Sequence, residues 1–208
     1  MRYVSLDLET SGPDPLRHQV LELAVVVEDT RRPRPLSELP SFRRLLRHSE
    51  IAGTAGALAL NARLLHEMAA TKDGAPDGPP DHCLPAEVLP QLREFLLAQG
   101  YKPDPKNQVR FIMAGKNVAS YDLLFLRELP GWGTAVRAEP ATLDPAAFYL
   151  NWHKDSRLPS MSICKARAKL PDTEVAHEAL ADALDVVRLL RPFYQLPVYQ
   201  PVALPPPE

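Results

Sequence analysis

Four acidic residues and one histidine have the types and spacings needed to act together on a metal ion and a water molecule. Asp7 and Glu9 lie two residues apart in an apolar run near the N-terminus. Because successive side chains of a strand point to opposite faces, both carboxylates leave one face, with Cα atoms roughly 7 Å apart. Burying two like charges there is costly unless a cation compensates them, which favours a metal site. The alternative is a strand end whose acids face water.

The other three residues lie far along the chain. Asp122 precedes an apolar run in NVASYDLLFLREL, where an ordinary first-turn aspartate would also be favoured by the helix dipole. His177 and Asp182 lie in HEALADALDVVRLL. Five residues of regular helix place these two side chains about 140° apart, so they can converge only if His177 lies at the helix start. The alanines around Asp182 would let this helix approach a sheet closely. A surface histidine and a solvated aspartate would explain the last segment alone.

The apolar pattern predicts the elements that must position these residues. Strands are expected at 2–8, 20–27, 41–47 and 109–114, with a short strand near 142–143. Helices are expected at 57–69, 86–99, 119–129, 161–169 and 178–190. Segment 71–85, dominated by Gly, Pro and Asp, predicts a mobile loop. Strands followed by alternating helices and strands indicate an α/β domain around a mixed sheet, over residues 1–191, with a proline-rich extended tail at 192–208.

Composition limits the classes of protein. A chain of 208 residues with 45% hydrophobic content can bury one full core. The net charge of −2 gives no global basic field, so a nucleic-acid partner would have to be bound locally or through metal. Cys83 and Cys164 form no zinc or disulfide pattern, which favours a reducing cytoplasm. Acids in the first ten residues do not fit a signal peptide, and no apolar run approaches the roughly 18 residues of a membrane span.

Together, DLET, NVASYDLLFL and HEALADA resemble the three motifs of the DEDDh group of 3′-to-5′ exonucleases. This group includes the proofreading subunit of bacterial DNA polymerase III, RNase T and oligoribonuclease. The motifs occur in the family's order and span most of the chain. The resemblance implies the ribonuclease H-like fold, a central mixed β-sheet flanked by α-helices. It also implies that Asp7, Glu9, Asp122 and Asp182 hold metal and that His177 is the general base.

The same resemblance implies a reaction and its partners. Two Mg²⁺ or Mn²⁺ ions would promote hydrolysis of the terminal phosphodiester at a single-stranded 3′ end and release nucleoside 5′-monophosphates. The backbone near Leu8, the side chain of Thr10 and Asn117 would hold the terminal nucleotide, with Asn61 as a further candidate. Relatives also form homodimers, and a polymerase or other protein partner is compatible with the resemblance. This chain departs from many relatives in having Lys116 before Asn117 and Tyr121 before the aspartate.

Other interpretations of these residues stay open. A catalytically silent module of the same fold could hold nucleic acid or a polymerase, although all five chemical positions are filled here. A phosphatase with an aspartyl nucleophile would need a second aspartate where Glu9 stands and would have no use for His177. Simple strand-end and helix-surface charges are the remaining interpretation. The residues do not distinguish DNA from RNA.

Overall fold

A mixed sheet forms the centre of the computed structural model, which describes residues 1–70, 81–170 and 178–195. In this part of the chain the sheet has six strands in the order β4-β3-β2-β1-β5-β6. The central strand β1 is antiparallel to β2 and parallel to β5. The strands are β1 (Arg2–Thr10), β2 (Val20–Asp29), β3 (Ser41–Leu46), β4 (His82–Cys83), β5 (Val109–Ala114) and β6 (Val136–Leu143). The predicted α/β class and mixed sheet are confirmed.

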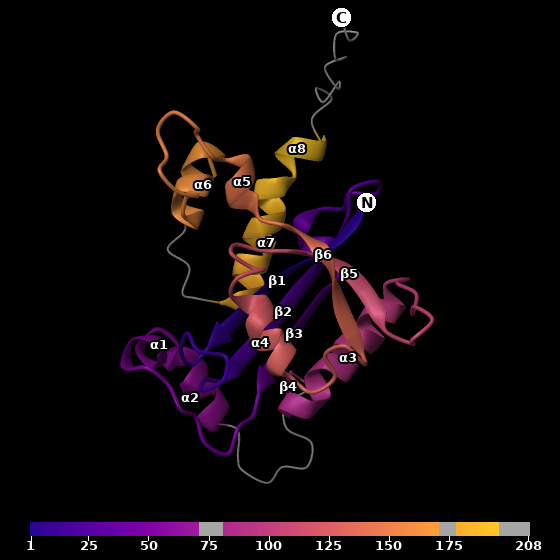
Figure 1. Ribbon diagram of the computed structural model, residues 1–208, viewed down its shortest axis with the longest axis vertical. Coiled ribbons are helices and arrows are strands. Elements are labelled where there is room, and N and C mark those ends of the chain that lie inside the picture. Colours follow the sequence, from indigo (N-terminus) through magenta and orange to yellow (C-terminus); the bar gives the residue numbers. More distant parts are fainter. Residues whose placement is uncertain (71–80, 171–177, 196–208) are drawn as a thin grey trace, which may run out of the picture.

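Helices surround this sheet, and Figure 1 shows α5 and α6 together at the end of α7 that leads into α8, far from α3. None of the helices in the described ranges is long and apolar enough to cross a membrane. The helices are α1 (Ala55–Leu60), α2 (Ala62–Ala70), α3 (Pro85–Ala98), α4 (Asp122–Glu128), α5 (Pro145–Phe148), α6 (Met161–Arg167), α7 (Ala179–Leu190) and α8 (Pro192–Gln195), with a 3₁₀ turn η1 (Leu36–Glu38).

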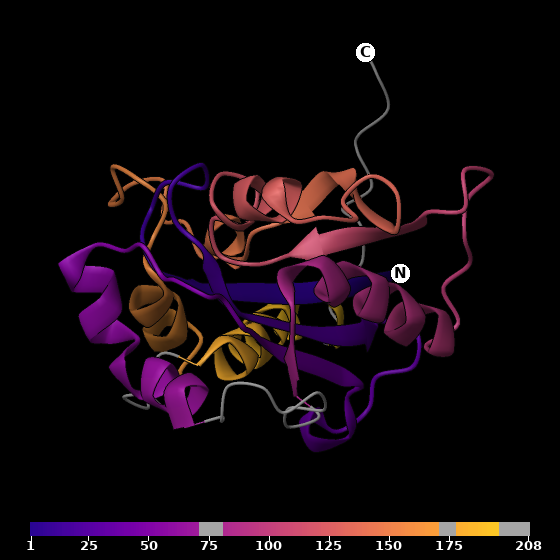
Figure 2. The same cartoon turned by 90° about the horizontal axis from the view of Figure 1, so that it is seen from below.

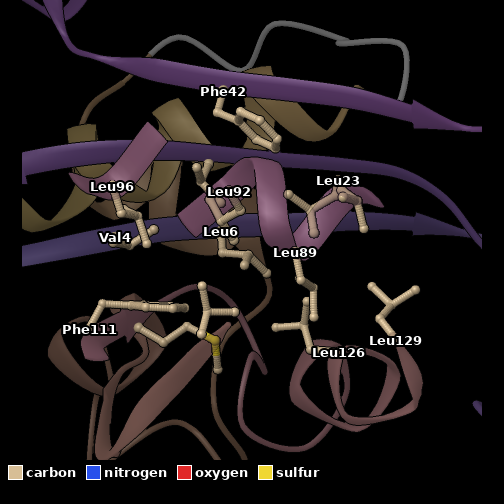
Figure 3. Close-up of a cluster of buried hydrophobic side chains, with 14 of the residues drawn as sticks. Val4, Leu6, Leu23, Phe42, Leu89, Leu92, Leu96, Phe111, Leu126 and Leu129 are labelled. Carbon is tan, nitrogen blue, oxygen red and sulfur yellow. The ribbon is translucent and has the colours of Figure 1, made fainter. Parts of the chain in front are cut away.

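The two faces of β1 have different roles. Its even-numbered residues, such as Leu6, are buried against α3 and α4, where Leu92 and Leu126 are fully buried (Figure 3). Its odd-numbered residues face α7, which lies on the opposite side of the sheet from α4 (Figure 2). Strand alternation therefore gives β1 one face for the main core and one face that can carry polar groups.

The helix α7 lies close to the odd-numbered face. Ala179 and Ala183 are completely buried at this contact. The hydroxyl of Ser5 donates to the carbonyl oxygen of Ala183 at 2.7 Å, a distance that a larger residue on the helix would prevent. The small residues seen in the sequence thus allow the close approach that brings the first turn of α7 to the carboxyl end of β1.

Two expected elements need correction. The helix predicted over 57–69 is two helices, because Asn61 ends α1 and its side-chain amide donates to the Thr10 carbonyl at 3.2 Å. The strand predicted near 142–143 is the end of the longer edge strand β6, whose exposed polar positions and Pro140 hid it from the apolar pattern.

Two further segments differ from the expectation. The predicted loop 71–85 contains β4 at His82–Cys83, which pairs in parallel with β3. The rest of the loop, residues 71–80, lies outside the described residues. The predicted extended segment from Pro192 begins as α8, held by Tyr194, whose hydroxyl donates to Glu28 at 3.2 Å.

Candidate active site

Three of the predicted metal ligands meet at the carboxyl end of β1. Asp7 and Glu9 lie on the face of β1 that packs against α7, and Asp182 lies in the first turn of that helix. One carboxylate oxygen from each residue lies within 4.8 Å of the other two. All three residues are half-buried. The sheet and one helix, far apart in sequence, therefore bring three negative charges to one point.

The fourth predicted acid, Asp122, approaches this group from α4. It is the first residue of α4 and is 4% exposed. Its Oδ1 accepts a hydrogen bond from the backbone N–H of Leu8 at 3.1 Å, which fixes the helix start beside β1. Asp122 is not among the three oxygens that share the 4.8 Å limit. It acts on them through its charge, which is the strongest single charge raising the pKa of Asp7.

The acids raise one another's pKa values. Burial is the largest cause of the raised pKa of Asp7, followed by the charges of Asp122, Asp182 and Glu9, which together hold it well above its usual range. Burial also raises the pKa of Glu9 to about 7, with Glu22 and Asp182 as the next causes. The pKa of Asp122 rises to about 7 through burial, opposed by its backbone hydrogen bonds. This concentration of carboxylates is an unfavourable state that a bound cation would relieve.

The donor set fits a hard divalent cation. Asp7, Glu9, Asp122 and Asp182 supply carboxylate oxygens and no nitrogen or sulfur. Mg²⁺, Mn²⁺ and Ca²⁺ prefer such ligands, whereas structural zinc sites use cysteine and histidine. The residues present therefore suit the metal chemistry implied by the sequence motifs.

A cavity of about 340 Å³ lies beside the acids. Leu8 and Thr10, both predicted to hold the terminal nucleotide, line it, and so does Asn61. The Thr10 hydroxyl lies 2.7 Å from the hydroxyl of Tyr121, which also lines the cavity. Tyr121 was visible in the sequence only as a departure from the motif. This contact links the end of β1 to the residue before α4 beside the cavity.

The other two predicted site residues are placed differently. Asn117 does not line the cavity beside the acids. It has a left-handed backbone conformation, with φ of 56°, in the turn before α4 and lines a separate groove. His177, the predicted general base, lies outside the described residues.

Sequence reasoning missed Glu22, which lies opposite Glu9 in the β1–β2 register. It is 1% exposed, forms a close ion pair with Arg43, and accepts a hydrogen bond from the backbone N–H of Ala179 at 3.2 Å. Glu22 therefore holds the start of α7, three residues before Asp182. The sequence signal was present, since Glu22 is the single acid within the apolar run VLELAVVV.

A second group of possible metal ligands contains Glu67, Asp81 and His82, whose donor atoms also lie within 4.8 Å of one another. Arg43 reaches this group as well: its guanidinium lies 3.6 Å from Glu67 and 3.2 Å from Asp81. An arginine already provides positive charge here. We call these three residues with Arg43 the Arg43 cluster, and the four predicted metal ligands the acid site.

Comparison with solved structures relates this fold to those of nucleases. No family model and no curated protein matches the sequence. Among solved structures, cell-death related nuclease 4 has a TM-score of 0.57 and 13% identity, covering 93% of this chain and 64% of that one. An Exonuclease I from Methylocaldum szegediense has a TM-score of 0.55 and 18% identity, covering 92% of this chain and 40% of the other. A full-length 3′-exonuclease has a TM-score of 0.62 and 11% identity, covering 93% and 60%.

These likenesses extend over nearly the whole chain, which in turn spans less than two thirds of each of these solved chains. They show that the chain has the ribonuclease H-like fold of these nucleases, as the motifs predicted. The acids of the acid site come from the first strand and from two helices that pack beside it.

Proposed function

We propose that this chain, which shares the fold of known nucleases, is a metal-dependent 3′-to-5′ exonuclease of the DEDDh type. It would hydrolyse the terminal phosphodiester bond of single-stranded DNA or RNA and release nucleoside 5′-monophosphates. The observation that carries the proposal is the meeting of Asp7, Glu9 and Asp182 within 4.8 Å, next to a cavity. The nuclease neighbours support the same class of reaction.

Each residue of the site has a role in this proposal. Asp7, Glu9, Asp122 and Asp182 would hold two Mg²⁺ or Mn²⁺ ions. Such ions, when bound, stabilise charge on the phosphate and make a water molecule more acidic. Through the bound ions, the four carboxylates would position the scissile phosphate. The carboxylates would be ionised, because the cations lower their raised pKa values.

Residues near the acids would bind the substrate and move the proton. The backbone at Leu8 and the side chain of Thr10 would hold the terminal nucleotide in the cavity that they line. The role of general base is assigned to His177 from the HEALADA motif alone. A neutral imidazole can accept the water's proton at neutral pH, since its ordinary pKa lies near 6.5. A role for Asn117 in holding the terminal nucleotide has no support in the position of that residue.

The test uses single strands of DNA and RNA with free or blocked 3′ ends, incubated with Mg²⁺, Mn²⁺ or EDTA. We expect 5′-mononucleotides only from free 3′ ends and only with metal. His177→Ala should lose nearly all activity, whereas His66→Ala, which changes an exposed histidine, should keep it. Strand binding without shortening under either metal would instead identify a catalytically silent binding module. The ratio of DNA to RNA cleavage would name the substrate.

A further inference from the structure

A second groove, larger than the cavity of the acid site, lies on the other side of the turn that leads into α4. Its volume is about 840 Å³, and it is lined by Lys116, Asn117, residues 154–161 and Ile163. Within the turn, the Asn117 carbonyl accepts hydrogen bonds from the backbone N–H groups of Ser120 and Tyr121 at 2.9 and 3.0 Å. Tyr121 lines the acid-site cavity. One short turn therefore separates the two depressions.

The charged side chains of this groove are mostly positive. Lys116, Lys154 and Arg157 line it. Among the described residues, Lys154 and Arg157 form no ion pair. The one carboxylate in the lining, Asp155, is bound through both oxygens by Arg167, a residue outside the lining. The groove thus keeps a local positive charge on a chain whose net charge is −2.

The third cation is less free, and it connects the groove to the acid site. The Lys116 ammonium donates to the Asn117 side chain at 2.6 Å and lies 4.0 Å from Asp144. Asp144 in turn accepts from the backbone N–H of Asn117 at 2.9 Å. These contacts hold Lys116 at the groove's edge, directly before the turn to α4. Lys116, the groove cation closest to α4 along the chain, is therefore held by two contacts.

Apolar side chains adjoin these cations. Leu158 and Ile163 line the groove and are 45% and 44% exposed. Trp152, two residues before Lys154, is 84% exposed. Trp152 does not line the groove, but it lies close to Lys154 along the chain. Cations with an exposed aromatic ring nearby suit a single nucleic-acid strand, whose phosphates pair with the cations and whose bases stack on aromatic rings.

We propose that the groove of Lys116, Lys154 and Arg157 binds the part of a single-stranded nucleic acid that precedes its 3′-terminal nucleotide, with Trp152 stacking on a base. This proposal rests on the proposed function. The acid-site cavity, of about 340 Å³, has room for the terminal nucleotide, so the rest of the strand must continue elsewhere. The groove across the turn offers positive charge for the phosphates of that part of the strand. Asn117, predicted to touch the terminal nucleotide, would touch the preceding one.

The test measures binding in EDTA, so that it does not depend on catalysis. The double variant Lys154→Glu with Arg157→Glu is compared with Lys102→Glu and Lys106→Glu, an equal charge change at exposed residues between α3 and β5. Fluorescence anisotropy gives the Kd for single strands of about twelve nucleotides, a length within known site sizes. Thermal unfolding confirms that both variants are folded.

We expect the groove variant to bind at least about tenfold more weakly and its salt slope to fall by about 1.4, which is about 0.7 for each of two phosphate contacts. The control variant should bind within about twofold of the wild type. Equal losses of affinity in both variants, or no loss in the groove variant, would contradict the proposal that the groove binds the strand. Nuclease assays on the same samples decide the proposed function separately, because a silent module with an intact groove would bind the strand and leave it uncut.

Discussion

Three acids of the acid site and three residues of the Arg43 cluster meet the same geometric condition for a metal site, yet the charges around the two groups differ. The charges that act on Asp7 are those of other carboxylates, and all of them raise its pKa. In the Arg43 cluster, a guanidinium lies within ion-pair distance of Glu67 and Asp81. Clustered ligand atoms alone therefore do not identify a metal site. The carboxylate charges that raise the pKa of Asp7 mark the acid site as a place where a cation would be favourable.

Arg43 and Glu22 form the physical link between the two regions. Arg43 pairs with Glu22 on one side and with the carboxylates of the Arg43 cluster on the other. Glu22 also holds the first N–H of α7, the helix that carries Asp182. The Arg43 cluster thus serves as a scaffold for the acid site. This division predicts opposite responses to the same chemical change in the two regions.

The largest expected difference is in catalysis. Asp7→Asn keeps the size of the side chain but removes a charge from the acid site, and we expect kcat to fall on the order of 10²–10³-fold. Asp81→Asn makes the same change in the Arg43 cluster and should leave kcat within about twofold of the wild type, since surface charge changes are usually mild. Nuclease assays with Mn²⁺ check both. An equal loss in Asp81→Asn would mean that the Arg43 cluster takes part in the reaction.

The positions of most site residues could be predicted because the relevant signals are local. The two-residue spacing of Asp7 and Glu9 dictates a common face on any strand, and the alanines around Asp182 allow close packing of any helix. The end of the helix at Asn61 could not be predicted, because it depends on a hydrogen bond to Thr10 across the fold. Asn117 was assigned to the terminal nucleotide from its motif, but the turn before α4 directs it to the other groove.

Glu22 and the edge strand β6 show a second limit of sequence reasoning. Glu22 is a lone acid in an apolar run, and only the strand register shows that it lies opposite Glu9 and meets the start of α7. The strand β6 was recognised only at its end, because parallel pairing with β5 stabilises polar residues that the apolar pattern does not count. The place of Glu22 and the length of β6 both depend on pairing between strands, which the apolar pattern does not show.

The second prediction concerns the link between the regions. Glu22→Ala removes the partner of Arg43 and the acceptor for Ala179, so we expect the free energy of unfolding to fall by about 2–3 kcal/mol. This corresponds to a fall in Tm of about 5–10 °C. Glu22→Gln keeps an acceptor oxygen for Ala179 and should lose less. Calorimetry of both variants measures the difference. If Gln and Ala were equally destabilising, the charge of the pair rather than the anchor of α7 would be responsible.

A smaller effect of opposite sign is expected without metal. Asp7→Asn relieves repulsion among the acids, so in EDTA its Tm should rise by a few degrees, about 1 kcal/mol of added stability. Asp81→Asn removes a partner of Arg43 and should leave Tm unchanged or slightly lower. Adding Mn²⁺ should raise the Tm of the wild type far more than that of Asp7→Asn. A lower Tm for metal-free Asp7→Asn would show that the acid site is not under electrostatic strain.

The last prediction concerns the pH dependence of stability in EDTA. The pKa values of Glu9 and Asp122 are both raised to about 7 in the folded protein, above their ordinary values near 4. Between about pH 4.5 and 7 the folded state therefore binds more protons than the unfolded state, and the free energy of unfolding rises as pH falls. Asp155, whose pKa Arg167 lowers to about 2, acts in the opposite sense. It stabilises the fold above its ordinary pKa and loses this effect only in stronger acid, outside the same window.

Thermal unfolding at pH 5.5 and 8 separates these contributions. Metal-free wild type should have the higher Tm at pH 5.5, and Glu9→Gln should reduce the difference because one of the titrating acids is gone. With Mn²⁺ the order should reverse, since cation binding requires ionised carboxylates and is stronger at pH 8. The difference between wild type and Glu9→Gln measures the contribution of Glu9 itself. A pH response that Glu9→Gln leaves unchanged would show that Glu9 is not among the titrating groups.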